Sequence, residues 1–187
     1  MALLHKDEDR LITGEELFRR PELGPCELVS GKIVPMAPTG FIHGDAELEL
    51  GMRLRAYAKE TGLGRVVGGD VGVYLRRNPD TVRAPDILFI SKERYARRRK
   101  SPGYLEVVPE LVVEVLSPAN RPGEIAEKLA DYFAAGVIAV WVLNPEVRRV
   151  SVYRSPRQVR HLGEGDVLSD EALLPGFSVP VAELFLE

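Results

Sequence analysis

At 187 residues, with 45% hydrophobic and 28% charged side chains, the chain has an ordinary globular composition, and we expect residues 1–187 to form one domain with a sizeable core. Its net charge of −3 argues against a protein permanently coated with polyphosphate, although a local basic groove stays compatible with it. The single cysteine, Cys26, excludes an internal disulfide framework and a cysteine-cluster zinc site; because every apolar run is also too short to span a bilayer, we expect a cytoplasmic protein outside membranes.

The first third of the chain predicts a short helix, a hairpin and a long helix. Thr13 followed by Glu16 is a capping-box pattern, which is typical of a helix start. Two short apolar runs within 26–36 flank a Ser-Gly pair, which favours a β-hairpin. Good helix formers fill 41–61 and end at Gly62, a typical C-cap.

The rest of the chain alternates strands and helices. The expected elements are two strands within 64–77 broken at a Gly-Gly pair, a strand at 84–90, a short helix or basic loop at 91–100, a strand at 110–116, a helix at 123–136, strands at 137–143 and 148–154, and a turn-rich tail. The strand–helix–strand unit at 111–143 predicts a right-handed crossover between parallel strands. We therefore expect an α/β or α+β fold, with a mixed central sheet flanked by helices, an extra N-terminal hairpin and C-terminal strands.

The segment PELVVEVLSPAN contains a carboxylate within an apolar strand. Val112, Val113 and Val115 indicate a buried strand, and Glu114 lies in the middle of it. Ionising an isolated buried carboxylate is very costly, so Glu114 needs a cation, a metal or a proton. A structural ion pair with an arginine is the alternative to a functional role.

Two residues are candidate partners of Glu114. Asp86 begins a second apolar strand in RAPDILFI, where an ordinary turn aspartate is the alternative. Lys128 lies in the following helix, where pairing with Glu124 is the alternative. Carboxylates on two strands of one sheet can face the same point, and such oxygen ligands suit Mg²⁺. A lysine beside them can orient or activate a water for phosphodiester hydrolysis.

The long helix carries a further polar pair. His43 and Glu47 continue a stripe formed by Leu50, Leu54 and Tyr57 at steps of four and three residues, so they point toward the interior or a cleft. The pair could bind zinc, form a half-buried hydrogen bond, or supply a carboxylate from Glu47 to the same metal site. Three histidines in the whole chain leave little to complete a zinc shell.

Four stretches, PDILFI, PELVVEVLSPAN, EKLADYFAAGV and VWVLNP, occur in an order and spacing that closely resemble the Uma-two family of proposed endonucleases. The resemblance covers nearly the whole chain. The family belongs to the PD-(D/E)XK nuclease superfamily, so the resemblance implies a restriction-endonuclease-like fold. It also implies an endonuclease that depends on Mg²⁺ or Mn²⁺, with nucleic acid as its partner and DNA as the expected substrate.

The resemblance implies roles for the matching residues. Asp86 matches the PD aspartate and Glu114 the acid of the second motif, and with a main-chain carbonyl near Val115 they are expected to bind the metal. The superfamily usually places a lysine two residues after this acid, where the chain has Leu116. Lys128 on the next helix is the lysine that matches, so Asp86, Glu114 and Lys128 form the expected catalytic set.

Other positions match auxiliary residues of the family or differ from its pattern. Glu27 and His43 match a glutamate and a histidine that the family tends to carry near the site, and Glu47 is a further auxiliary candidate. Relatives commonly have aspartate where this chain has Glu124 and glutamate where it has Ala139.

The basic run RYARRRK provides a candidate nucleic-acid contact. Arg97, Arg98, Arg99 and Lys100 could contact phosphates beside the metal site, or form a solvated loop. We expect a homodimer, since nucleases of this superfamily often pair and the apolar tail LLPGFSVPVAELF offers surface to bury. The alternative function is a catalytically silent nuclease-fold module for nucleic-acid binding or protein assembly.

Overall fold

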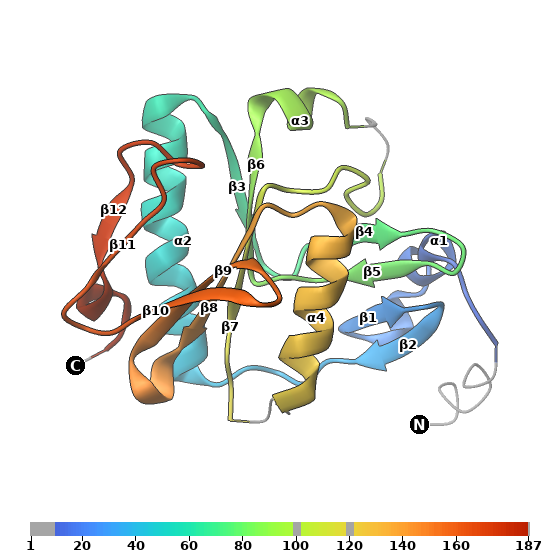
Figure 1. The fold of residues 1–187 in the computed structure, drawn as a ribbon. Helices are drawn as coiled ribbons and strands as arrows, with labels where there is room; N and C mark the ends of the chain where they lie inside the picture. Colours follow the sequence, from blue (N-terminus) through green and yellow to red (C-terminus); the bar gives the residue numbers. More distant parts are fainter. Residues whose placement is uncertain (1–9, 99–101, 119–121, 187) are drawn as a thin grey trace.

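The computed structural model describes residues 10–98, 102–118 and 122–186 (Figure 1). Its helices are α1 (Gly14–Phe18), α2 (Phe41–Thr61), α3 (Lys92–Ala96) and α4 (Pro122–Ala135), with short 3-10 helices at Pro21–Leu23, Pro145–Val147 and Val181–Leu184. Its strands are β1 (Cys26–Val29), β2 (Lys32–Pro35), β3 (Gly64–Gly68), β4 (Val73–Arg76), β5 (Thr81–Arg83), β6 (Ile87–Ser91), β7 (Leu111–Val115), β8 (Ala139–Asn144), β9 (Arg149–Ser155), β10 (Gln158–Leu162), β11 (Val167–Ser169) and β12 (Ser178–Pro180). Within these ranges, no helix has the length and apolar character needed to cross a bilayer.

A six-stranded mixed sheet forms the centre of the molecule, in the order β10-β9-β8-β7-β6-β3. Strands β7 and β8 are parallel because α4 connects them, which confirms the predicted crossover; the other neighbouring strands are antiparallel. Helices α2 and α4 pack on opposite faces of this sheet (Figure 1). The α2 face buries Leu50, Leu54 and Trp141, and the α4 face buries Val112 and Leu129.

A second sheet of four strands, in the order β2-β1-β5-β4, packs its own small core around Leu28, Tyr74 and Val82. The predicted hairpin is present as β1–β2, and both turn residues, Ser30 and Gly31, have positive φ. The sequence did not indicate that β4 and β5 join this hairpin instead of the central sheet. That pairing depends on long-range register, which local periodicity does not encode.

Local signals explain where α1 and α2 begin and end. The Thr13 hydroxyl accepts from the Glu16 N–H, and the Glu16 carboxylate accepts from the Thr13 N–H, so the predicted capping box is present. Helix α2 ends at Gly62, whose φ of 66° lies in the left-handed region that favours glycine. The predicted stripe of α2 turns inward, with His43 and Leu50 buried.

The apolar tail packs into the core of its own chain. Leu174, Phe177, Val181 and Leu184 are buried, and Phe177 stacks on Trp141. The idea that this tail supplies a dimer surface is therefore wrong, because its apolar side chains are already covered by α2 and the central sheet. The homodimer itself stays a prediction.

Candidate active site

Two neighbouring strands bring Asp86 and Glu114 together. Ile87 at the start of β6 pairs with Val113 of β7, so Asp86 lies opposite Glu114. The Asp86 Oδ2 atom accepts a hydrogen bond of 2.6 Å from the Val115 N–H. Both carboxylates are buried, and the charge of each therefore acts on the other at short range.

Glu114 has a donor on each carboxylate oxygen, and both come from α4. Lys128 Nζ lies 2.7 Å from Oε2, and the Tyr132 hydroxyl donates to Oε1 at 2.5 Å. Lys128 and Tyr132 are four residues apart, which places them on one face of the helix. Burial raises the pKa of Glu114 from 4.5 to about 7; the charge of Asp86 adds to this rise, while Lys128 and Tyr132 oppose it.

Lys128 also connects Glu114 to the four-stranded sheet. Its Nζ lies 3.4 Å from Glu27 Oε1, and Glu27 in turn accepts from Arg83 at 2.7 Å and from the Ala84 N–H at 2.9 Å. Arg83 makes a second ion pair with Asp131 at 2.6 Å. Burial alone would lower the pKa of Lys128, but the carboxylates of Glu114 and Glu27 outweigh it and raise the pKa, so Lys128 is a cation at neutral pH.

A second group of ligand atoms lies on the other side of Asp86. His43 Nε2 is 3.3 Å from Asp86 Oδ1 and 3.9 Å from Glu47 Oε2, and one ligand atom from each of the three residues fits within 4.8 Å. Glu114 is not a member of this group within the part of the chain that the structure describes. Burial would lower the pKa of His43, but Asp86 and Glu47 outweigh it and raise the pKa; burial and the charge of Asp86 raise the pKa of Glu47.

The β3–β4 connection borders this group. A Cβ at Gly68 would lie 3.3 Å from the Asp86 carbonyl oxygen and 3.7 Å from Glu47 Oε1, so the chain passes close to both acids. Asp70 follows with a positive φ of 55°. Partial burial and the charge of Asp86 raise the pKa of Asp70. Asp70 is thus a further acidic side chain at the rim of the site.

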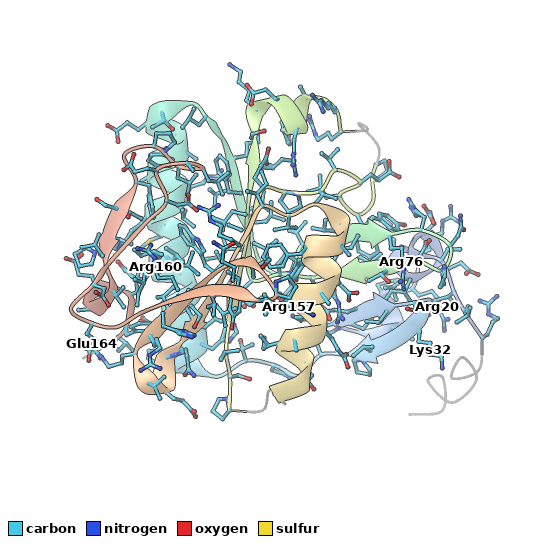
Figure 2. All side chains as sticks on the ribbon, viewed as in Figure 1. Arg20, Lys32, Arg76, Arg157, Arg160 and Glu164 are labelled. Atoms are coloured by element: carbon cyan, nitrogen blue, oxygen red, sulfur yellow. The ribbon has the colours of Figure 1, made fainter. Side chains whose placement is uncertain are left out.

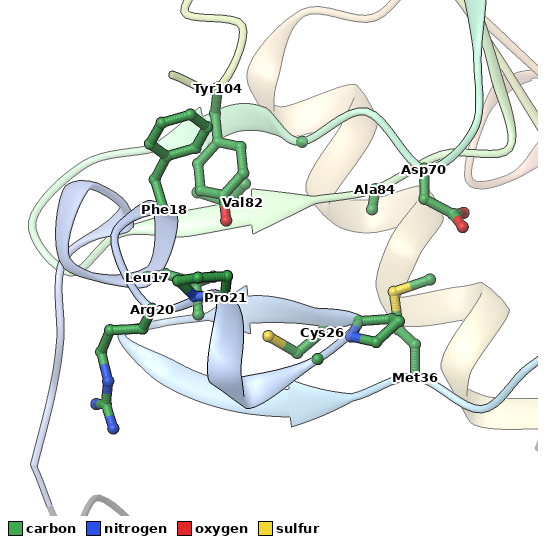
Figure 3. Close-up of a pocket in the computed structure, with 13 residues that line it drawn as sticks. Leu17, Phe18, Arg20, Pro21, Cys26, Met36, Asp70, Val82, Ala84 and Tyr104 are labelled. Carbon is green, nitrogen blue, oxygen red and sulfur yellow. The ribbon is translucent and has the colours of Figure 1, made fainter. Parts of the chain in front are cut away.

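A cavity of about 210 Å³ lies next to Asp70 (Figure 3). Most of its lining side chains are apolar, among them Leu17, Phe18 and Tyr104, and Asp70 lines one edge. Cys26 also lines it, and burial raises the pKa of this thiol. The four-stranded sheet and the segments next to it thus form a mostly apolar cavity that reaches Asp70 at the rim of the acidic site.

The structure brings the predicted acidic, lysine and histidine residues of the site together in two groups. Glu27, Glu114 and Lys128 form one connected group, and His43, Glu47 and Asp86 form another, joined by the Asp86–Val115 hydrogen bond. Val115 contacts Asp86 through its N–H, whereas the role that we predicted uses its carbonyl.

Two residues of the predicted basic strip, Arg97 and Arg98, lie beyond the end of β6 that is farther from Asp86. Arg97 ends α3, and Arg98 places its guanidinium 3.7 Å from the centre of the Tyr95 ring. Helix α3 follows β6, whereas Asp86 precedes that strand, so the two are separated by about 16 Å along it. Arg99 and Lys100 lie outside the described residues.

Sequence reasoning missed Arg83, Tyr132 and Asp70. Arg83 lies in the apolar stretch TVRAPDILFI, and a cation there is the same kind of signal that drew attention to Glu114. Tyr132 follows Lys128 by four residues, so the face of the predicted helix that carries Lys128 was the signal for it. Asp70 lies in a Gly-Gly-Asp turn, where nothing distinguishes it from an ordinary loop aspartate.

A sequence model of the Uma2 family, described as "Putative restriction endonuclease", matches residues 15–182. The chain belongs to this family. Among solved structures, the Uma2 chain resembles a "putative nuclease belonging to DUF820" from Anabaena variabilis, with a TM-score of 0.77 and 19% identity over 93% of this chain and 97% of the other. This likeness confirms the predicted restriction-endonuclease-like fold. Among curated proteins, none matches the chain.

Proposed function

We propose that this Uma2 protein is a metal-dependent endonuclease that hydrolyses phosphodiester bonds, with Asp86, Glu114 and Lys128 as its catalytic set. The observation that carries this proposal is the 2.7 Å contact between Lys128 on α4 and Glu114 on β7, directly beside Asp86. Lys128 of α4 and Glu114 of β7 thus lie near Asp86, which directly precedes β6, and a lysine beside two acids suits a nuclease site. Membership of the Uma2 family supports the same activity.

The donor set of the site suits a divalent cation. Among the described residues, six carboxylates lie around two cations, Arg83 and Lys128: Glu27, Glu47, Asp70, Asp86, Glu114 and Asp131. This excess of negative charge in a partly buried space favours a bound metal. Asp86, Glu114 and the carbonyl of Val115 would hold Mg²⁺ or Mn²⁺, with Glu47 and His43 as auxiliary ligands. The metal would neutralise negative charge on the phosphate and lower the pKa of a bound water molecule.

Lys128 acts as a positioning cation in this proposal. Because its pKa is raised, the ammonium group keeps its proton at neutral pH and is a poor acceptor of a proton from water. It can instead donate hydrogen bonds to Glu114 and to the phosphate oxygens, and so stabilise negative charge as the bond breaks. Tyr132 holds the other oxygen of Glu114 and fixes the carboxylate in place.

The substrate in this proposal is nucleic acid, with DNA as the expected form. The surface cations labelled in Figure 2 are spread over two parts of the molecule: Arg20, Lys32 and Arg76 around the four-stranded sheet, and Arg157 and Arg160 at the β9–β10 hairpin. With a net charge of −3, we expect weak binding that depends strongly on salt. The contact role of Arg97, Arg98, Arg99 and Lys100 stays a prediction.

The test is an assay on plasmid, linear duplex, single-stranded DNA and RNA with Mg²⁺ or Mn²⁺. We expect cleavage by the parent protein and a loss of at least about 100-fold in Asp86→Asn, Glu114→Gln and Lys128→Met. Lys59→Met and Glu60→Gln remove the same charges from exposed positions near the end of α2 and should keep the parent activity. Cleavage that persists equally in the site variants would contradict the proposal.

A catalytically silent module is the second candidate. It is favoured by one observation: both oxygens of Glu114 are already bonded within the protein, by Lys128 and Tyr132. Such a module binds nucleic acid or a protein without cleaving it. Binding of the same substrates without cleavage in either metal would select this function.

A further inference from the structure

The buried imidazole of His43 contacts Asp86, but this contact lacks the geometry of a hydrogen bond. His43 lies in the first turn of α2 and is 6% exposed, and neither ring nitrogen has a hydrogen-bonding partner among the described residues. Buried polar side chains in proteins are nearly always hydrogen-bonded, so each exception calls for an explanation. A ligand supplied from outside the chain would satisfy Nε2, the ring nitrogen that faces Asp86 and Glu47.

Two carboxylates face the same ring nitrogen. His43 Nε2 lies 3.3 Å from Asp86 Oδ1 and 3.9 Å from Glu47 Oε2. Atoms bound to one small divalent cation at about 2.1 Å lie between about 3 and 4.2 Å apart. Both separations from Nε2 fall in this range, and one ligand atom from each of the three residues lies within 4.8 Å of the other two, slightly wider than a shared cation requires.

The residues around the three ligands orient the Asp86 carboxylate and leave an open path by which a cation can reach the site. The Val115 N–H holds Asp86 Oδ2, which leaves Oδ1 on the side of His43. Glu47 is half-buried and lines an open cavity of about 350 Å³ with Leu48, Gly69 and Ile87. Oriented ligands and an entry path are what a metal site needs beyond its ligand atoms.

We propose that His43, Glu47 and Asp86 form a cation site with one nitrogen and two oxygen ligands, which prefers a first-row transition cation such as Mn²⁺ to Mg²⁺. Mg²⁺ is a hard cation that takes oxygen ligands, and imidazole suits transition metals such as Fe²⁺ and Zn²⁺; Mn²⁺ takes carboxylates as Mg²⁺ does, and as a first-row transition ion it also accepts an imidazole nitrogen. Three protein ligands leave positions open for water or a phosphate oxygen. The site lies on the α2 side of Asp86, away from the Lys128–Glu114 contact, and Asp86 is the residue that the two groups share.

This inference extends the proposed nuclease site, but it is tested by metal binding without substrate. Metal-free protein is titrated with Mn²⁺ while electron paramagnetic resonance reports the free ion, and Mg²⁺ is then added as competitor. We expect the parent to bind Mn²⁺ at least about tenfold more tightly than Mg²⁺. His43→Ala should weaken Mn²⁺ binding by at least about tenfold and leave Mg²⁺ binding less affected. His161→Ala, which removes an exposed histidine hydrogen-bonded to Ser151, should match the parent.

Two results would overturn the site: a parent without a preference for Mn²⁺, or a His43→Ala protein that binds Mn²⁺ as tightly as the parent. Circular dichroism establishes that each variant is folded. If His43→Ala does not fold, Glu47→Gln at the half-buried position replaces it, and undiminished Mn²⁺ binding there overturns the site equally. Mn²⁺ binding through His43 in a protein that cleaves no nucleic acid would support this site while removing the proposed nuclease function.

Discussion

At the scale of single residues, Tyr132 and Lys128 hold Glu114 in one orientation. Tyr132 is fully buried, and its hydroxyl and the Lys128 ammonium each occupy one oxygen of the carboxylate. Even with both donors present, burial keeps the pKa of Glu114 well above that of a free carboxyl group. Glu114 is therefore fixed in place but costly to ionise, because its surroundings are poorly solvated.

Removing the Tyr132 hydroxyl should loosen this arrangement. Tyr132→Phe keeps the ring in the core but leaves Glu114 Oε1 without its donor, so we expect a loss of about 1–2 kcal/mol in the free energy of unfolding. Urea denaturation measures this loss. In Tyr57→Phe, the matched control, the lost hydroxyl donates to the exposed carbonyl of Pro175, and the effect should be smaller. Equal losses of stability in the two variants would mean that the buried hydrogen bond to Glu114 contributes no more to the free energy of unfolding than the exposed one.

The raised pKa of Glu114 predicts a pH dependence of stability. The unfolded chain loses this proton near pH 4.5 and the folded chain near pH 7, so the folded state binds more protons between these values. Stability should therefore fall as pH rises from 4.5 to 7 and stay reduced above pH 7, by about 3 kcal/mol for a displacement of this size. Glu114→Gln should remove this dependence and be at least as stable as the parent at pH 8.

The measurement is a set of urea melts of both proteins between pH 4.5 and 8 in the presence of a chelator. Comparing the two proteins isolates Glu114 from the other groups that titrate. A variant that is clearly less stable at pH 8 would show that the ion pair with Lys128 serves the fold, because the variant leaves that cation without one of its partners.

At the scale of elements, the edge strand β3 ends beside the acidic site. It pairs with β6 along its whole length, and its last residue, Gly68, passes close to Asp86 and Glu47. At its other end, Gly64 pairs with Ser91, where a Cβ would lie 2.3 Å from the Ile90 carbonyl oxygen. The close approach of these two strands therefore requires glycine at position 64.

A methyl group at this position should disturb the sheet. Gly64→Ala places its Cβ against the Ile90 backbone and 2.8 Å from the Phe89 ring, so we expect a loss of about 1–3 kcal/mol in stability. Gly44→Ala is the opposite case, because nothing lies within 4 Å of its Cβ and α2 gains a better helix former; a gain of about 0.5–1 kcal/mol is expected. Thermal melts compare the two, and a Gly64→Ala protein as stable as the parent would contradict the close strand packing.

At the scale of the whole molecule, a buried polar network joins the two sheets. Glu27 of β1 pairs both with Arg83 of β5 and with Lys128 of α4, and Lys128 in turn contacts Glu114 of β7 in the central sheet. The candidate site therefore depends on how the two sheets pack together. That residues 1–187 form a single domain stays a prediction.

The homodimer is a prediction at the same scale. The tail is internal, so the expectation now rests on the resemblance to nucleases that pair, while the exposed apolar side chains Phe41, Leu48 and Met52 lie on α2. Light scattering at micromolar concentration should give twice the chain mass of 20.7 kDa. A mass of one chain alone would contradict it.

The sequence by itself determined most of the helices and the strands of the β7–α4–β8 unit, and it indicated Glu114 and Lys128 as central candidates for the site. The Thr13–Glu16 capping box, the Gly62 C-cap and the β7–α4–β8 unit follow from residues close together in the chain, because caps and periodicity are local. Glu114 was identified because an acid in an apolar strand needs a partner, and Lys128 is that partner in the structure.

Only the tertiary structure decided which residues surround those acids. Glu27 and Arg83 are 56 residues apart, yet they form one buried ion pair, and Tyr132 shares Glu114 with Lys128. Likewise, β4 and β5 pair with the β1–β2 hairpin in a four-stranded sheet instead of joining the central sheet. These outcomes depend on strand register and on the direction of each side chain, which are set by the packing of distant segments and leave no local pattern in the sequence.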